Sequence, residues 1–182
     1  MGGGEGPFLM NFYNTLQSKP MILAADPDLE TLIACANGSY QGYRPHYVTP
    51  CIQRNESLTR ITAHMDCQSL HYTGLVMVEV WSYNPEMLRA VLKMVRSQAF
   101  QWVAAAIPQP QRRSVFLLVQ ADIESHEQYV ETHRALCARL RQLMPPMLHT
   151  RPNLANETDF LQLHLDRKCF YRHDSTPFVP AE

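Results

Sequence analysis

The sequence predicts a single α+β domain with a mainly antiparallel sheet and helices packed on one face of it. Apolar and polar residues alternate along the segments 58–69 and 75–82, which is the period of half-buried strands. The segments 85–100 and 124–143 instead repeat apolar residues at the spacing of amphipathic helices. The chain has 182 residues, enough to bury one sizeable core. Strands and helices around one core are typical of an α+β fold.

No internal repeat or shift in composition divides the chain, so residues 7–182 are predicted to form one domain. The glycine-rich residues 1–6 (MGGGEG) are expected to be disordered. Apolar residues make up 46% of the chain, yet no apolar run has the length of a membrane span. The N-terminus lacks the pattern of a secretory signal, and the five cysteines include no close pair. We therefore expect a cytoplasmic protein in which all thiols are free.

The first third of the chain is predicted to begin with a helix. In PFLMNFYNTLQS (7–18) the bulky apolar side chains fall on one helical stripe, and Pro7 suits a first turn. MILAA (21–25) can form a short buried strand. A second helix is predicted in DPDLETLIACANG, with Asp26 as its N-cap and Gly38 as its left-handed stop.

The remaining segments are predicted from their periodicity and their turn residues. SYQGYRPHYVTPCIQ is aromatic and interrupted by prolines, which is typical of a loop or an edge strand. The strands 58–69 and 75–82 form a hairpin that turns near Gly74. The later predicted elements are a helix at 85–100, an apolar strand at 114–122, a helix at 124–143 and a last strand at 159–166.

From the strand at 21–25 to the strand at 114–122, the predicted order is β-α-β-β-α-β. This is the element order of a ferredoxin-like core. The helix at 124–143 and the strand at 159–166 would then be additions at its C-terminal end. We expect the strand at 114–122 in the centre of the sheet because it is so apolar.

Alternation sorts the side chains of each predicted strand onto two faces of the sheet. In the segment 75–82 the valines face the core, which leaves Met77, Glu79 and Trp81 on the face without helices. The strands at 58–69 and 159–166 each add a His-x-Asp pair to that face if all of them share one sheet. The outward residues of interest are His64, Asp66, Glu79, Trp81, His164 and Asp166.

Two interpretations of these polar residues remain open. An imidazole and a carboxylate from one strand can ligate a divalent metal together with a third ligand from a neighbouring strand. Without a metal, the carboxylate can orient the imidazole as a general base. The preferred interpretation is a polar sheet face that contacts water or a partner, with no metal and no cofactor. The catalytic candidates of the alternative are His64, Asp66, Glu79, His164 and Asp166.

Aromatic and arginine residues also cluster in the segment 40–52. Tyrosine, tryptophan and arginine are the residue types that dominate the binding energy of protein interfaces. A loop that carries them, next to an open sheet face, favours contact with another protein chain. The predicted binding residues are Tyr40, Tyr43, Arg44, Tyr47 and Trp81.

A stripe of basic residues follows one face of the predicted helix 85–100 and continues after it. Domains that bind nucleic acid usually carry a basic excess, whereas this chain has a formal net charge of −1. We therefore interpret the stripe as solvated and expect neither a nucleic-acid nor a membrane partner. Its members are Arg89, Lys93, Arg96, Arg112 and Arg113.

Other residues that could carry chemistry have simpler interpretations. His126 and His133 lie seven residues apart on one helical face, and we predict that both are partly buried packing residues. Cys51 could act as a nucleophile with His46, but no orienting third residue accompanies them. The chain contains no motif that names an activity.

Two function classes follow. The first is a non-enzymatic interaction or assembly (adaptor) protein that holds another chain, either a different protein or a second copy of itself. It would use the open sheet face or the aromatic segment 40–52. The alternative is a small metal-dependent or acid/base enzyme that uses the pairs His64/Asp66 and His164/Asp166.

Overall fold

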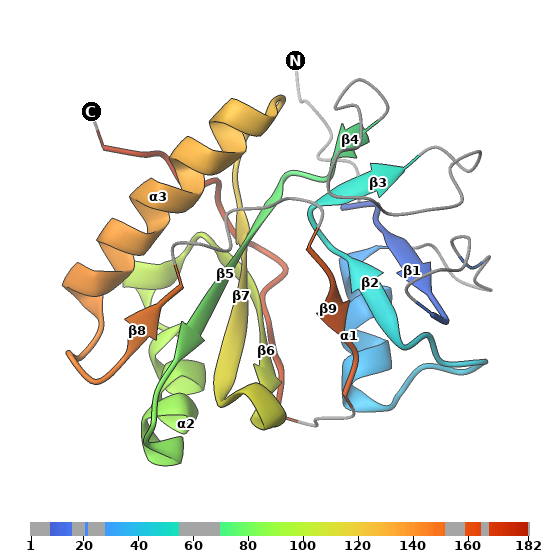
Figure 1. Ribbon diagram of the computed structural model, residues 1–182, viewed down its shortest axis with the longest axis horizontal. Helices are drawn as coiled ribbons and strands as arrows, with labels where there is room; N and C mark the ends of the chain where they lie inside the picture. Colours follow the sequence, from blue (N-terminus) through green and yellow to red (C-terminus); the bar gives the residue numbers. More distant parts are fainter. Residues whose placement is uncertain are drawn as a thin grey trace.

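The computed structural model describes residues 8–15, 21, 28–54, 70–151, 159–164 and 168–181. The described strands are β1 (Asn11–Tyr13), β2 (Tyr47–Thr49), β3 (Ile52–Arg54), β4 (Leu70–Tyr72), β5 (Leu75–Trp81), β6 (Val103–Gln109), β7 (Ser114–Gln120), β8 (His149–Thr150), β9 (Leu161–Gln162) and β10 (Phe170–Tyr171). The helices are α1 (Leu29–Asn37), α2 (Pro85–Met94) and α3 (His126–Leu143), with short 3₁₀ turns η2 (Gln98–Phe100) and η3 (Pro110–Arg112). The described part of the chain thus confirms the α+β class, with antiparallel sheets (Figure 1).

The largest sheet contains five strands in the order β10-β6-β7-β5-β8, and all its neighbours are antiparallel. Between β5 and β8 the chain runs β5-α2-β6-β7-α3-β8, so each helix connects two strands that flank a third. This β-α-β-β-α-β succession lies further along the chain than the one predicted over 21–122. The prediction lacked β6, which lies between α2 and β7. Residues 22–25 of the predicted first strand (21–25) and the whole predicted strand 58–69 lie outside the described residues.

Helices α2 and α3 cover the same face of this sheet. Val80 pairs with Val115 on β7 and with Thr150 on β8, so these three side chains share a face. Val115 and α2 together line one groove, and the Cys137 side chain of α3 hydrogen-bonds Thr150. The predicted packing of the helices on one face is therefore confirmed. Val91 is the residue of α2 that has no exposed surface.

The helix ends follow local signals in the sequence. Asn84 caps α2 by accepting from the Glu86 N–H, and Ser125 caps α3 by accepting from the Gln128 N–H. α1 begins after Asp28, which accepts from the Thr31 N–H, and not after the predicted cap Asp26. It ends at Gly38 in the predicted left-handed conformation, with φ of 82°.

A second sheet has the order β1-β2-β9, and α1 lies next to it in Figure 1, across the molecule from α3. The helix predicted at 7–18 is wrong for its described residues, because Asn11–Tyr13 pair with β2 as a strand. All three residues of β1 are buried there. The aromatic residues Phe12 and Tyr13 suit a buried strand, and pairing with β2 outweighs the helical period of the segment.

The last predicted strand, 159–166, is much shorter than expected and lies in a different sheet from β5. Only Leu161–Gln162 form β9, which pairs with β2. The Gln109 side-chain amide donates to the Gln162 carbonyl at 3.0 Å and so links β6 to β9. Buried residues of both sheets form one continuous core. None of the helices in the described part of the chain is long and apolar enough to cross a membrane.

Candidate interaction surface

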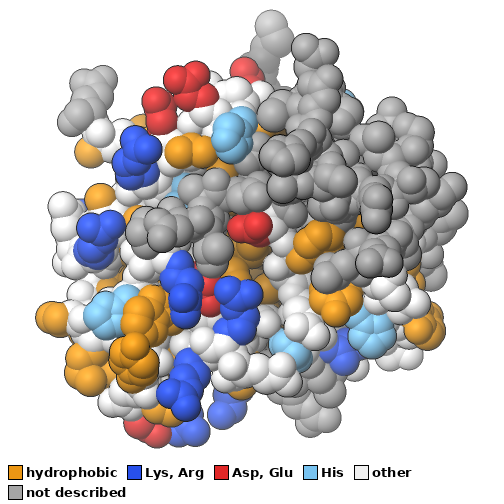
Figure 2. Space-filling view, in the orientation of Figure 1, with side chains coloured by type: hydrophobic (Ala, Val, Ile, Leu, Met, Phe, Trp, Pro, Cys, Tyr) orange, Lys and Arg blue, Asp and Glu red, His pale blue; other side chains and the backbone are white. Residues whose placement is uncertain are grey.

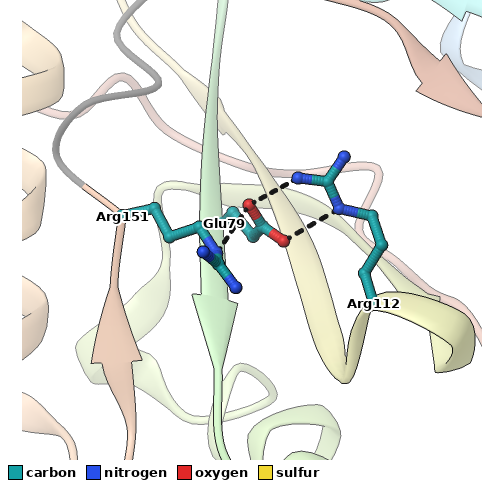
Figure 3. Close-up of polar contacts among 3 residues, drawn as sticks. All are labelled: Glu79, Arg112 and Arg151. Carbon is teal, nitrogen blue, oxygen red and sulfur yellow. Dashed lines mark hydrogen bonds and ion pairs between the residues drawn. The ribbon is translucent and has the colours of Figure 1, made fainter.

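The helix-free face of the five-stranded sheet is built around a buried carboxylate. Glu79 projects from the middle of β5, and its side chain has no exposed surface. Arg112 donates to both of its oxygens, from Nε to Oε1 at 3.1 Å and from Nη2 to Oε2 at 3.0 Å. Arg151 binds Oε2 from its Nε at 3.2 Å. Figure 3 shows the two guanidinium groups on either side of the carboxylate.

The two arginines come from segments that lie far apart in the sequence. Arg112 ends η3, the 3₁₀ turn that connects β6 to β7, whereas Arg151 follows directly after β8. The Arg151 N–H also donates to the Glu79 carbonyl at 3.2 Å, so main chain and side chain hold the same residue. A buried carboxylate requires such partners, because an unpaired charge away from water is very costly.

Aromatic side chains continue the surface from Glu79 to the end of β5. Trp81 lies two residues beyond Glu79, so the two side chains share a face. Its ring contacts the rings of His149 and Tyr83, with centroids 4.7 Å and 5.0 Å apart. The Arg151 guanidinium lies 5.1 Å from the centroid of the Trp81 ring, within the range of cation–π attraction. We call this set, Trp81, Tyr83, Arg112, His149 and Arg151, the Trp81 surface.

Much of the Trp81 surface is accessible. The exposed fraction is 76% for Tyr83, and the side chains of Arg112 and Arg151 are 51% and 43% exposed. Figure 2 shows basic side chains next to hydrophobic ones and a histidine on this face. His149 also lines an adjoining groove of about 500 Å³ between the end of α3 and β8, which Arg141 borders. The surface therefore combines exposed aromatic area, fixed cations and a depression.

The sequence predicted Glu79 and Met77 as outward-facing, and both are buried. This prediction was wrong because the helix-free face is not open at those positions. Arg112 and Arg151 cover Glu79, and Asp159 and Phe160 line a small cavity of about 120 Å³ with Met77 and Glu79. Trp81, by contrast, is only half-buried and stays accessible, as expected of a binding residue.

The predicted His-x-Asp sites stay predictions. His64, Asp66 and Asp166 lie outside the described residues. His164 is half-buried and lies two residues after the end of β9, a strand of the β1-β2-β9 sheet, whereas Glu79 lies in the five-stranded sheet. Within the described residues no three metal-ligating side chains come together. Both oxygens of Glu79 are occupied by arginine N–H groups, which leaves this carboxylate poorly suited to accept a proton from a substrate.

Among the predicted binding residues of the aromatic segment 40–52, Tyr43 is exposed and the others are partly buried. Tyr43 is 67% exposed, and its hydroxyl donates to Asn14 Oδ1 at 3.3 Å. Arg44 instead donates to the Leu163 carbonyl at 2.8 Å and so ties the loop to the segment after β9. Tyr47 lies in β2, and its ring meets Phe160 edge-on. Tyr40 is half-buried against the core.

Of the histidines and the cysteine named in the sequence, His133 and Cys51 are buried and contribute to packing. His126 is exposed, so the predicted partial burial of His126 and His133 was wrong in each case. Burial lowers the pKa of His133 below its ordinary value. Cys51 is buried, and the Tyr129 hydroxyl donates to its Sγ at 3.4 Å. Burial also raises the pKa of the Tyr129 hydroxyl, which keeps it neutral.

Sequence reasoning missed most members of the Trp81 surface. Arg112 was interpreted as part of a solvated basic stripe, and Arg151, Tyr83 and His149 carry no sequence signal of their own. Only the proximity of Trp81 and Tyr83 at one strand end was detectable. Chemically, the surface can accept an apolar or aromatic group and donate hydrogen bonds to an acceptor. No protein-family model, no curated protein and no solved structure matches this chain.

Proposed function

We propose that the protein is a non-enzymatic interaction or assembly protein that holds another protein chain on the Trp81 surface. The observation that carries the proposal is the fixation of two half-exposed arginines by one buried carboxylate, beside an exposed tyrosine and a half-buried tryptophan. Arginine, tyrosine and tryptophan are the residues most enriched among energetic hot spots of interfaces.

Preorganisation makes these arginines suitable for binding. A free arginine loses side-chain entropy when a partner immobilises it, at a cost of about 0.5–1.5 kcal/mol. Arg112 and Arg151 are already held by Glu79. The Arg112 guanidinium also lies over the ring of Phe116, and the Arg151 guanidinium lies over the ring of Trp81. Arg112 uses Nε and Nη2 for Glu79 and Arg151 uses Nε, so each guanidinium has a further nitrogen that these contacts do not use.

The partner therefore needs hydrogen-bond acceptors next to an apolar or aromatic group. Carboxylates are the acceptors that arginine binds best, because two parallel N–H donors match two oxygens. An acidic segment with an aromatic side chain, contributed by a different protein or by a second copy of this chain, meets both needs. Nothing among the described residues favours the enzymatic alternative over this one.

A cytoplasmic location remains part of the proposal. The described cysteines Cys35, Cys51 and Cys137 are buried, and burial raises the pKa of the Cys35 thiol to about 11. A thiol titration of the unfolded, unreduced protein is expected to find five reactive groups. A count of one or three would mean disulfides and would contradict a reducing compartment.

The proposal is tested first by selecting binding peptides from a displayed random library with the intact protein. Enriched peptides are expected to be acidic and to contain an aromatic residue. Binding should fall at least about tenfold in Tyr83→Ala and in Arg151→Gln, since each removes a central contact. Arg139→Gln, on an exposed position of α3, is the matched control and should leave binding unchanged. Peptides that bind both Trp81-surface variants as well as the wild type would contradict the proposal.

Light scattering during size-exclusion chromatography separates the two kinds of partner. A dimer that dissociates in Arg151→Gln but persists in Arg139→Gln would identify a second copy of this chain as the partner. A monomer at all concentrations, together with enriched acidic peptides, would point to a different protein.

A further inference from the structure

A second concave site lies on the opposite, helix-covered face of the five-stranded sheet. It is a groove of about 260 Å³ between α2 and the β6–β7 connection. Its floor is apolar and includes Leu88 and Leu92 from α2, Pro108 from β6 and Val115 from β7. Pockets for drug-sized ligands usually have volumes of about 300–1,000 Å³, so this groove suits a smaller molecule.

The groove explains why two leucines of α2 are only partly buried. Val91 of the same helix has no exposed surface. Leu88 and Leu92 are half-buried because the side chains that they face, Pro108 and Val115, stand across the groove. An apolar ligand that filled the groove would remove this leucine surface from water, which is favourable in proportion to the area covered.

Three basic side chains line the same groove: Arg89 from α2, Arg113 from the β6–β7 connection and Lys168. All three are exposed, and Arg89 also binds Glu86 at 2.9 Å. Arg113 has a left-handed backbone with φ of 53°, the one non-glycine residue with positive φ in the described part of the chain. Two hydrogen bonds fix it: its N–H donates to the Pro110 carbonyl, and its carbonyl accepts from the Ser82 N–H.

From an apolar floor with a cationic border we infer that this groove binds a small aliphatic carboxylate. The alkyl chain would cover the two leucines, and the carboxylate would pair with the guanidinium of Arg113 at the border. An acidic group alone would leave the leucines exposed, and a neutral alkyl group would make no ion pair with the Arg113 guanidinium. The inference is independent of the Trp81 surface, because Val115 and Trp81 lie on opposite faces of the sheet.

Titration of the isotope-labelled protein with octanoate, below its critical micelle concentration, tests the inference. Amide resonances of residues 86–92 and 113–115 should shift and saturate, with a Kd of about 1 mM for so small a ligand. Octanol, which lacks the carboxylate, and acetate, which lacks the long alkyl chain, are titrated at the same concentrations as controls. Each should bind at least about tenfold more weakly than octanoate, because each lacks one of the two contacts.

Arg113→Asn is the decisive variant. Asparagine tolerates the left-handed backbone, so the turn should be retained while the guanidinium is lost. Octanoate binding should weaken at least about tenfold, whereas Lys93→Gln, which removes a charge from α2 outside the groove lining, should leave it unchanged. Comparison of the amide spectra without ligand checks that each variant is folded.

Several results would overturn the inference. These are shifts outside the groove, shifts that do not saturate, equal binding of octanol, and unchanged binding in Arg113→Asn. If the acidic peptides selected from the library competed with octanoate for this groove, its ligand would be a protein partner and not a small carboxylate. Loss of peptide binding in Tyr83→Ala with octanoate binding intact would show that the two sites are separate, so failure of one leaves the other standing.

Discussion

The two faces of the five-stranded sheet are both buried around β5, but by different means. On one face, Val76, Val78 and Val80 pack beneath α2 and α3. On the other face none of the described helices lies over Glu79, and arginines from two distant segments cover it. The first face is closed by the hydrophobic effect, and the second by ion pairs and hydrogen bonds.

This difference teaches what alternation along a strand can and cannot tell. It sorted the residues of β5 correctly into two faces, because successive side chains of a strand always point in opposite directions. It could not tell that the polar face is buried around Glu79. The partners of that carboxylate come 33 and 72 positions later in the sequence, and no local pattern connects them.

The largest effect on the free energy of unfolding is expected for a substitution on the helix-covered face. Leu117→Ala removes a side chain with no exposed surface from the central strand β7. We expect the free energy of unfolding to fall by about 4 kcal/mol, because lost burial and a new cavity add up. Urea denaturation measures it, with Leu117→Met as a control that should cost less than about 1.5 kcal/mol. A loss below about 1 kcal/mol for Leu117→Ala would mean that this face is loosely packed.

The second-largest effect on the free energy of unfolding is expected on the face of the sheet that carries Glu79. Glu79→Gln is expected to lower the free energy of unfolding by about 2 kcal/mol, less than the 3–5 kcal/mol typical of a broken buried pair. The reason is that the side chains of Arg112 and Arg151 are about half exposed and can be hydrated once the carboxylate is gone. Arg112→Gln alone should cost about 1 kcal/mol, and the double variant should cost less than the sum of both. Additive losses would contradict an energetic coupling between the two residues.

A smaller effect depends on pH and arises on α3. Burial holds the pKa of His133 below its ordinary value, while the unfolded chain titrates near 6.5. As pH falls below 6.5, the unfolded state takes up a proton that the folded state does not, so stability decreases, at most by about 1.4 kcal/mol per pH unit. Urea denaturation at pH 7.5 and 5.5 should show a smaller difference for His133→Leu than for the wild type. An equal difference would assign the pH dependence to other groups.

The smallest effect on the free energy of unfolding is expected for an exposed ion pair. Glu86 and Arg89 on α2 lie 2.9 Å apart, and their side chains are 73% and 63% exposed. Glu86→Gln should change the free energy of unfolding by about 0.3 kcal/mol, the usual value for exposed pairs on helices. It is the matched control for Glu79→Gln, since both replace a carboxylate that binds arginine. If Glu86→Gln and Glu79→Gln lowered the free energy of unfolding equally, burial of the Glu79 carboxylate would add nothing to the stability of the protein.

The sequence by itself determined the elements whose signals are local. α2 and α3 follow from helical periodicity and from capping by Asn84 and Ser125, and β5 and β7 follow from their valine-rich and leucine-rich runs. Gly38 ended α1 as predicted, because only glycine adopts its conformation without strain. These features depend on residues within a few positions of one another, so one sequence can indicate them.

Tertiary structure alone decided the rest. β1 was predicted as a helix and became a strand because β2 pairs with it. β6, with the sequence VAAAIPQ, has weak strand propensity, and its Pro108 lies outside the pairing with β10, which among the described residues joins Ala105 and Ala106. The Trp81 surface and the groove beside α2 exist only where segments distant in the sequence meet. Their residues are brought together by the energy of the whole core, which no single segment encodes.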